Sequence, residues 1–326
     1  MKTIKAAALQ LEVQTGHVAD NIHNAEQLCL QAIEEGARLI ALPEFFTTRI
    51  VLDQQVYDSV LPKDNEALRM MTGLASQHDC WIGGSMMVAD GDEVYNRYYF
   101  VEPDGTVHPH DKDIPTMWEA AFYTAGKDDG HFQTQLGGVG AAVCWELIRS
   151  QSIQRLSGKV DLLMTGSHWW TTPSNWGWLF NKMSASTAQY NRYLAENAPV
   201  EFAQRLGAPL VHANHCGYFE TTSSCIPGTT AGLKFRSHFV GHTQIVDANG
   251  HILARRHGDA GPGIVTADIE IGAQEVTRKT ADNFWLPALP QILKASWYQD
   301  GLWGKVHYNR KGRQAGLDAA KRHELI

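Results

Sequence analysis

The sequence predicts a mixed α/β fold, and two observations favour it. Apolar segments of strand length alternate with helical segments through most of the chain. The second half repeats the plan of the first, and each half has a hairpin with a similar turn, at residues 102–105 and 247–250. Alternating strands and helices are typical of mixed α/β proteins. The repeated plan indicates an internal duplication, which would place two sheets back to back.

In the first half, the helix over residues 20–36 has the clearest signals. Asp20 or Asn21 can cap it, apolar side chains recur at helical spacing, and Gly36 ends it. The other expected elements are a helix over residues 65–78 and strands over residues 4–9, 39–42, 81–85 and 95–101.

In the second half, a strand ends at Val143 and a long helical region is expected to break at Pro199. A helix near residues 148–157 and strands over residues 161–165, 210–213, 238–246 and 264–269 complete this half.

The pattern changes near residue 272, where large aromatic side chains appear with little helical or strand period. We therefore expect a domain over residues 1–272 and a C-terminal extension over residues 273–326. An exposed extension with so many aromatic residues would promote aggregation. It is expected to pack on its own core or on a dimer partner, with a helical or frayed end after Gly312.

Composition limits the functions that the chain can have. The 326 residues are 44% hydrophobic, which suffices for a sizeable core, and the formal net charge is -7. The sequence contains no basic run of the kind that would indicate nucleic-acid binding. It also contains no apolar stretch as long as a membrane span. The five cysteines and 15 histidines show no metal-ligand spacing. These features predict a cytoplasmic protein without a metal or cofactor, in which a reactive thiol would stay reduced.

Three segments carry side chains that could perform chemistry. Cys144 follows an apolar strand, where a thiol can be a nucleophile or merely a small buried side chain. Glu44 also follows an apolar strand, and a buried glutamate is either an acid/base with a raised pKa or half of an ion pair. Lys112 and Glu119 lie in an aromatic-rich segment, where alone they could be ordinary surface charges.

Together these segments resemble the nitrilase superfamily of carbon–nitrogen hydrolases. In that family a strand ends in Pro-Glu, a loop supplies a lysine, a second glutamate follows, and a third strand ends in the nucleophilic cysteine. Glu44, Lys112, Glu119 and Cys144 match that order. The resemblance runs from about residue 3 to about residue 272 and includes Gln10, Asp20-Asn21, Gly83-Gly84-Ser85, Tyr95-Asn96, Asn214 and the hairpin over residues 239–250. It implies a four-layer α-β-β-α sandwich that pairs through helices into a homodimer or larger homo-oligomer.

The resemblance also implies roles for the four residues. Cys144 would be the nucleophile, Glu44 its general base, Lys112 the cation facing the developing negative charge, and Glu119 the residue that orients the site. The reaction would release ammonia and a carboxylic acid from a small nitrile or primary amide through a thioester on Cys144.

The substrate pocket is expected to be apolar and aromatic, with Trp145, His168, Trp169 and Tyr123 among its residues. Trp145-Glu146 after the cysteine resembles the sequence of true nitrilases. True nitrilases commonly have Asn at the next position, where this chain has Leu147, and this departure counts against a nitrile substrate. A soluble N-acyltransferase, an N-carbamoyl amide hydrolase, an ammonia-supplying partner of a synthetase, and a binding protein on a hydrolase fold stay open as alternatives.

Overall fold

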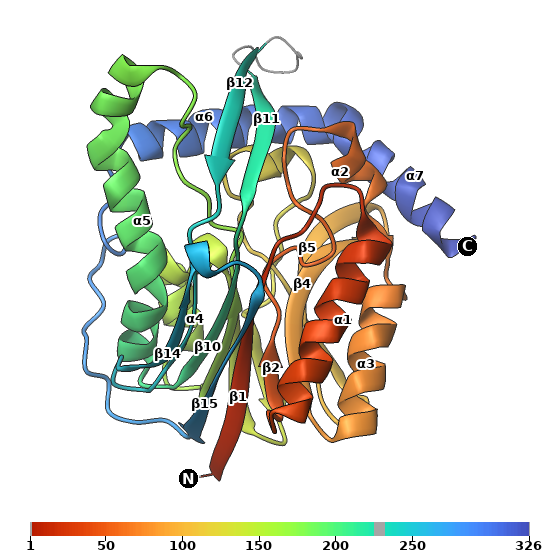
Figure 1. The fold of residues 1–326 in the computed structure, drawn as a ribbon, viewed down its shortest axis with the longest axis vertical. Coiled ribbons are helices and arrows are strands. Elements are labelled where there is room, and N and C mark those ends of the chain that lie inside the picture. The colour runs from red at the N-terminus through yellow and green to blue at the C-terminus, as the bar shows by residue number, and fades with distance from the viewer. Residues whose placement is uncertain (1, 225–231, 326) are drawn as a thin grey trace.

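The computed structural model describes residues 2–224 and 232–325, and it shows two sheets between two layers of helices (Figure 1). The first sheet has the strand order β6-β5-β4-β2-β1, with β3 on β4 and β15 on β1. Its strands are β1 (Lys2–Leu11), β2 (Leu39–Ala41), β3 (Leu61–Pro62), β4 (Trp81–Asp90), β5 (Glu93–Val101), β6 (Val107–Asp111) and β15 (Gly263–Ile271).

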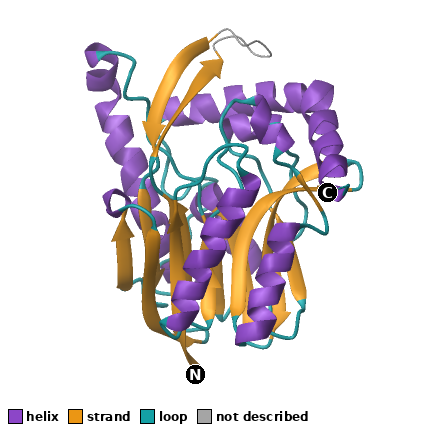
Figure 2. Cartoon of the chain, turned by 45° about the vertical axis from the view of Figure 1, so that its right-hand side comes forward, coloured by secondary structure: helices purple, strands orange, loops and turns teal. Residues whose placement is uncertain are grey.

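The second sheet continues from the first, because the end of β1 also pairs in parallel with β10. Its order is β10-β9-β8-β7, with β13 on β10 and β14 on β13. The strands are β7 (His131–Thr134), β8 (Gly137–Val143), β9 (Leu162–Gly166), β10 (Leu210–His215), β13 (Gly241–Val246) and β14 (Ile252–His257). The hairpin of β11 (Tyr218–Ser224) and β12 (Gly232–His238) projects beyond the sandwich (Figures 1 and 2).

The helices cover the two outer faces. Helices α1 (Val18–Glu34) and α3 (Glu66–His78) lie on the first sheet, and α4 (Ser150–Leu156) and α5 (Trp178–Leu206) on the second (Figure 1). Along β1, Ala7 and Leu9 pack with α1 and α3, whereas Ala6 and Ala8 face the other sheet. This alternation is the period of a strand buried on both faces. The expected α-β-β-α sandwich is thus confirmed.

The remaining helical segments lie at the carboxyl ends of the parallel strands. They are α2 (Gln54–Asp58), the short helices η1 (Met117–Ala121), η2 (Cys144–Ile148) and η3 (Gly258–Ala260), the π-helical turn η4 (Tyr308–Gly312), α6 (Gln291–His307) and α7 (Arg313–Glu324). Figure 1 shows α6 and α7 running across this end of the sandwich.

Three expected details of the helices and strands are wrong. Helix α1 begins after His17, and Asn21 does not cap it, because its side chain is buried and binds Gln14 and the carbonyl of Thr47. The strand expected over residues 238–246 is two strands, β12 and β13.

The third detail is α5, which continues through Pro199 without a break. The buried side chains Leu194 and Phe202 hold both halves of the helix in the core. Gln244 and Arg255 donate hydrogen bonds to the carbonyl of Glu196, in the turn before the proline. Packing and these side chains therefore outweigh the local cost of an internal proline.

The extension after residue 272 is largely helical and packs on its own chain. Trp285, Leu289 and Trp297 are buried in the core that includes β8 and α5. Tyr308 accepts a hydrogen bond from the backbone N–H of Val94 (2.9 Å) and donates to Glu93 (2.7 Å).

Candidate active site

The candidate catalytic side chains meet where three strands end. Glu44 lies three residues after β2, Lys112 directly after β6, and Cys144 directly after β8. Because these strands run in the same direction, their carboxyl ends lie at one edge of the sandwich. Glu119 reaches the same place from η1.

The backbone at the site adopts an uncommon conformation. Phe45, Met117 and Cys144 have φ of 53°, 54° and 53°, in the left-handed region that residues other than glycine rarely enter. Each lies within two residues of a candidate catalytic residue or is one itself. Such strain is typical of functional sites, where the surrounding packing holds a side chain in one direction.

The ammonium group of Lys112 lies between the two glutamates. Its Nζ is 2.8 Å from Oε1 of Glu44 and 2.7 Å from Oε2 of Glu119, and all three side chains are buried. Burial would lower the pKa of Lys112, but the charges of Glu119 and Glu44 outweigh it and raise the pKa well above the usual value. Lys112 therefore stays positively charged, and these two bonds use two of its three N–H groups.

Glu44 is held on both carboxylate oxygens. Oε1 also accepts a hydrogen bond from Nδ2 of Asn96 (2.8 Å), and Oε2 accepts one from the backbone N–H of His168 (2.8 Å). Burial raises its pKa to about 7, although Lys112 opposes the shift. A carboxyl group with that pKa can both accept and return a proton near neutral pH.

The thiol of Cys144 and the carboxyl group of Glu44 are close enough for each to shift the pKa of the other. Burial and the negative charge of Glu44 raise the pKa of this thiol well above its usual value. The thiol is therefore protonated in the free protein, and its proton must leave during the attack on a substrate. Glu44 is the adjacent base that can take it.

Glu119 is fixed more firmly than a surface residue would be. Its Oε2 accepts hydrogen bonds from the backbone N–H of Thr116 (3.0 Å) and from the hydroxyl of Tyr123, besides that from Lys112. The carboxylate therefore orients Lys112, and within the described part of the chain it makes no hydrogen bond to Cys144.

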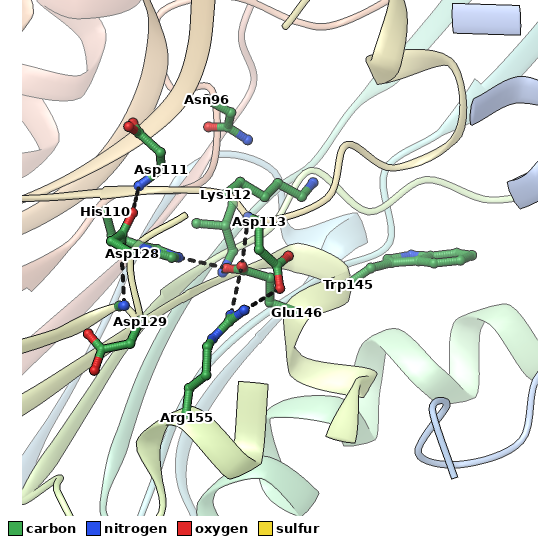
Figure 3. Close-up of polar contacts among 12 residues, drawn as sticks. Asn96, His110, Asp111, Lys112, Asp113, Asp128, Asp129, Trp145, Glu146 and Arg155 are labelled. Carbon is green, nitrogen blue, oxygen red and sulfur yellow. Dashed lines mark hydrogen bonds and ion pairs between the residues drawn. The ribbon is translucent and has the colours of Figure 1, made fainter. Parts of the chain in front are cut away.

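A second set of charged side chains, which includes His110, Asp113, Glu146 and Arg155, lies beside Lys112 (Figure 3). Oε2 of Glu146 accepts hydrogen bonds from the backbone N–H of Val143 (2.7 Å) and from His110 (3.0 Å), and Oε1 accepts one from the N–H of Asp113 (3.0 Å). Val143 precedes Cys144, and Asp113 follows Lys112. One carboxylate thus connects the nucleophile turn to the lysine loop.

This second set is balanced in charge. The charges of Glu146 and Asp128 outweigh burial and raise the pKa of His110 to about 10, so the imidazole is positively charged. Arg149 and Arg155 both bind Asp113, at 2.5 Å each. In Figure 3, the indole of Trp145 points away from the carboxylate of Glu146.

A small pocket opens beside Cys144, and about 40 Å³ of it is open to the centres of water-sized molecules. Trp145, His168 and Trp169, all expected there from the sequence, line it. Burial, with a contribution from His215, lowers the pKa of His168 well below its usual value, so this side chain is neutral. The other lining residues are Thr116, Met117, Glu119, Trp170, Thr172, Asn191 and Leu293.

Tyr123 is not among these lining residues. Its ring packs against Phe45, with the ring centroids 5.9 Å apart, and its hydroxyl donates a hydrogen bond to the carboxylate of Glu119. Tyr123 therefore supports Glu119, and a contact with substrate stays a prediction.

Sequence reasoning missed several residues of the site. Asn96 was noted for its place in a motif, but its bond to Glu44 needs the strand pairing of β4, β5 and β6. Asn191 and Leu293 come from α5 and α6, far along the chain. No local pattern marks them, because only the packing of these helices brings them to the pocket.

The comparisons with known proteins agree with this fold and show the family of the chain. The family model described as carbon-nitrogen hydrolase matches residues 5–279, so the chain belongs to that family. It is a carbon–nitrogen hydrolase of the nitrilase superfamily, with amidases among its relatives.

Two curated relatives illustrate the likeness. A 2-oxoglutaramate amidase of Bacillus subtilis (strain 168) is 24% identical over 285 residues, which cover 85% of this chain and 95% of the relative. An omega-amidase NIT2 of Danio rerio is 28% identical over 192 residues, which cover 54% of this chain and 68% of the relative.

Solved structures show the same fold at lower identity. XC1258 from Xanthomonas campestris, a CN-hydrolase superfamily protein, has a TM-score of 0.63 and 18% identity, covering 83% of this chain and 91% of that one. An amidase from Nesterenkonia sp. AN1 has a TM-score of 0.60 and 17% identity, covering 82% of this chain and 93% of that one. In the described part of this chain, no helix is long and apolar enough to cross a membrane.

Proposed function

We propose that this protein hydrolyses the C–N bond of a small, uncharged primary amide through a thioester on Cys144. One observation carries the proposal: a buried lysine is held between two buried glutamates, and one of these, Glu44, interacts with the neighbouring thiol of Cys144. A nucleophile, a base and a fixed cation are the groups that acyl transfer requires.

In the first step, Sγ of Cys144 attacks the carbonyl carbon while Glu44 takes the thiol proton. The carbonyl π bond breaks, and its electron pair moves to oxygen. Lys112 has one N–H beyond its two carboxylate bonds, and it can face this oxygen. A fixed donor of this kind stabilises the transition state by about 3 kcal/mol.

In the second step, Glu44 returns the proton to the leaving nitrogen, the C–N bond breaks, and ammonia departs. Water then attacks the thioester as Glu44 accepts one of its protons. The C–S bond breaks, the carboxylic acid forms, and the proton returns to the sulfur. Glu44 acts in both halves, which suits a carboxyl group whose pKa is about 7.

The lining of the pocket supports an uncharged substrate. Apart from Glu119, the residues named as lining it are aromatic, apolar, hydroxyl or amide side chains and the neutral His168. A substrate such as 2-oxoglutaramate, named for one relative, carries a carboxylate that would call for a cation. Arg49 and Arg236 bind Tyr218 and Glu220 instead, and Arg192 lines a separate groove.

A small nitrile is the second candidate substrate. Trp145 and Glu146 follow the nucleophile as in true nitrilases, and both are built into the site, Trp145 in the pocket and Glu146 behind it. Attack on a nitrile would give a thioimidate, which water converts to the thioester as ammonia leaves.

We also propose that the protein works as a homodimer or larger homo-oligomer in a reducing compartment. Large apolar side chains are exposed on α5 and α6, including Trp178, Met183 and Leu302. Such side chains are common at interfaces between subunits. Light scattering during size-exclusion chromatography measures the assembly directly.

The function is tested by ammonia release from matched amides and nitriles, with wild type and Cys144→Ala compared. The proposal predicts release from propionamide, little release from 2-oxoglutaramate, and none in the variant. Ammonia from propionitrile without accumulation of the amide would favour the nitrile. Products formed only when an amine acceptor is added, or release only from N-carbamoyl compounds, would contradict the proposal.

A further inference from the structure

We propose that Leu293 on α6 sets the size limit of the substrate pocket and so restricts the enzyme to short acyl groups. The inference rests on the proposed function and specifies its substrates. It concerns a helix that lies outside residues 5–279, the part of the chain that matches the family model.

The segment before α6 is attached directly to the nucleophile turn. The backbone N–H of Leu286 donates to the carbonyl of Ile148 (2.8 Å), and that of Ser150 donates to the carbonyl of Phe284 (3.0 Å). These bonds surround a β-bridge between Arg149 and Trp285. The extension is therefore fixed just after η2, the short helix that begins with Cys144.

Two tryptophans of the extension, Trp285 and Trp297, pack against Trp145, the residue after the nucleophile. The rings of Trp145 and Trp297 are parallel, with centroids 5.4 Å apart, and Trp285 meets both rings edge-on. All three are buried. Stacked and edge-to-face pairs at these distances are attractive, so the position of Trp145 depends on the extension.

The other side of α6 lies against η1, which carries Glu119. At Gly304 the helix is so close that a Cβ atom would stand 2.8 Å from the carbonyl carbon of Ala120. A helix at this separation cannot move closer to η1, and the segment just before it, residues 284–286, is hydrogen-bonded to Ile148 and Ser150. These contacts fix the position of the wall that α6 forms.

Leu293 is the residue through which this wall reaches the substrate. It is the lining residue contributed by α6, and it is 9% exposed. The space open to the centres of water-sized molecules is about 40 Å³, which corresponds to roughly three waters beside Cys144. A longer acyl chain would have to displace the Leu293 side chain.

The test compares kcat/KM for amides from acetamide to hexanamide in wild type, Leu293→Ala and Leu293→Phe. In Leu293→Ala, the ratio of hexanamide to propionamide should rise about 10-fold or more, since one methylene in a tight pocket changes kcat/KM by at least that much. Leu293→Phe should lower the ratio, and it carries the test if the alanine variant does not fold. The control is Ile292→Ala, the next residue on α6, whose side chain is 56% exposed and outside the pocket lining.

A second readout separates this inference from the proposed function. Alkylation of Cys144 by N-alkyl iodoacetamides of increasing chain length, followed by peptide mass spectrometry, reports pocket size without turnover. If no amide is hydrolysed but Leu293→Ala speeds labelling by the longer reagents, the proposed function is rejected and the size limit set by Leu293 is supported. If chain length affects labelling and turnover equally in wild type and both Leu293 variants, the inference is overturned.

Discussion

The thiol of Cys144 and the carboxyl group of Glu44 form one proton-exchanging unit. Burial raises both pKa values, that of Glu44 to about 7. In the proposed mechanism the thiol attacks as its proton moves to Glu44, so we expect the ionisation of Glu44 to control the rate. An inflection in the dependence of the rate on pH would belong to the whole set of interacting groups, including Lys112.

We therefore expect kcat/KM to rise with pH through about 7. Below that pH Glu44 is protonated and cannot accept the thiol proton, and above it the carboxylate is free to act. Glu44→Gln should lower kcat/KM by about 100-fold or more. The measurement is a rate profile from pH 5 to 9, with circular dichroism at each pH to confirm that the protein stays folded. A flat profile across this range would contradict the role of Glu44 as the base.

Glu146 is expected to position Lys112 and Cys144 relative to one another. A glutamine has one acceptor oxygen, so Glu146→Gln must lose one of its bonds to the N–H groups of Val143 and Asp113. A displacement of about 1 Å costs about 100-fold in rate, and we expect kcat to fall by that order with KM little changed. Steady-state kinetics on a small amide measures kcat and KM separately.

The matched control is Glu102→Gln. Glu102 is also a buried carboxylate that binds a histidine, His108 (2.7 Å), and a backbone N–H, that of Gln135 (2.8 Å). Among the described residues, its carboxylate makes no hydrogen bond to the lysine loop or the nucleophile turn. The two variants should melt at similarly lowered temperatures, but only Glu146→Gln should lose activity. Equal losses of activity would mean that Glu146 acts through stability alone.

At the scale of elements, the close approach of α6 to η1 depends on Gly304. A methyl group there would meet the backbone of Ala120 at 2.8 Å. We expect Gly304→Ala to lower the free energy of unfolding by roughly 1–3 kcal/mol, the usual cost of overpacking. Denaturant unfolding followed by tryptophan fluorescence measures this difference.

Gly301 offers a control on the same helix, because no atom lies within 4 Å of a Cβ built there. Gly301→Ala should leave stability unchanged or raise it by about 0.5–1 kcal/mol, since alanine is the better helix former. If both alanine variants unfold alike, the contact between α6 and η1 is looser than the structure shows.

The elements differ in how far the sequence could predict them. Helix α3 begins where the expected helix does, with Asn65 as a true cap that accepts from the N–H of Leu68. In contrast, the sequence of α6 shows little helical periodicity, because apolar side chains lie on both its buried and its exposed sides. The continuation of α5 through Pro199 depends on tertiary contacts that no local pattern contains.

The same distinction holds for the site. Glu44, Lys112, Glu119 and Cys144 could be predicted because their order along the chain matches that of the nitrilase superfamily, whereas each segment alone left other interpretations open. The contact between Glu146 and the backbone of Asp113, like the place of Leu293 in the pocket, joins segments far apart in the chain. Only the folded arrangement brings these groups together.

At the scale of the whole molecule, the chain after residue 279 should be required for folding. It buries Trp285, Leu289 and Trp297 against the core, and its loss would expose Trp145. We expect a chain of residues 1–279 to aggregate or to lack a cooperative melting transition, as measured by size-exclusion chromatography and differential scanning fluorimetry. A monodisperse truncated protein that melts like wild type would contradict this expectation.

The most direct test of the account is intact-mass spectrometry of the protein quenched in acid during turnover of a small amide. We predict a mass increase equal to one acyl group, replacing one hydrogen, that maps to the peptide containing Cys144. The increase should be absent from Cys144→Ala, which should also release no ammonia. Turnover without any adduct, combined with activity in Cys144→Ala, would contradict a thioester mechanism at this site.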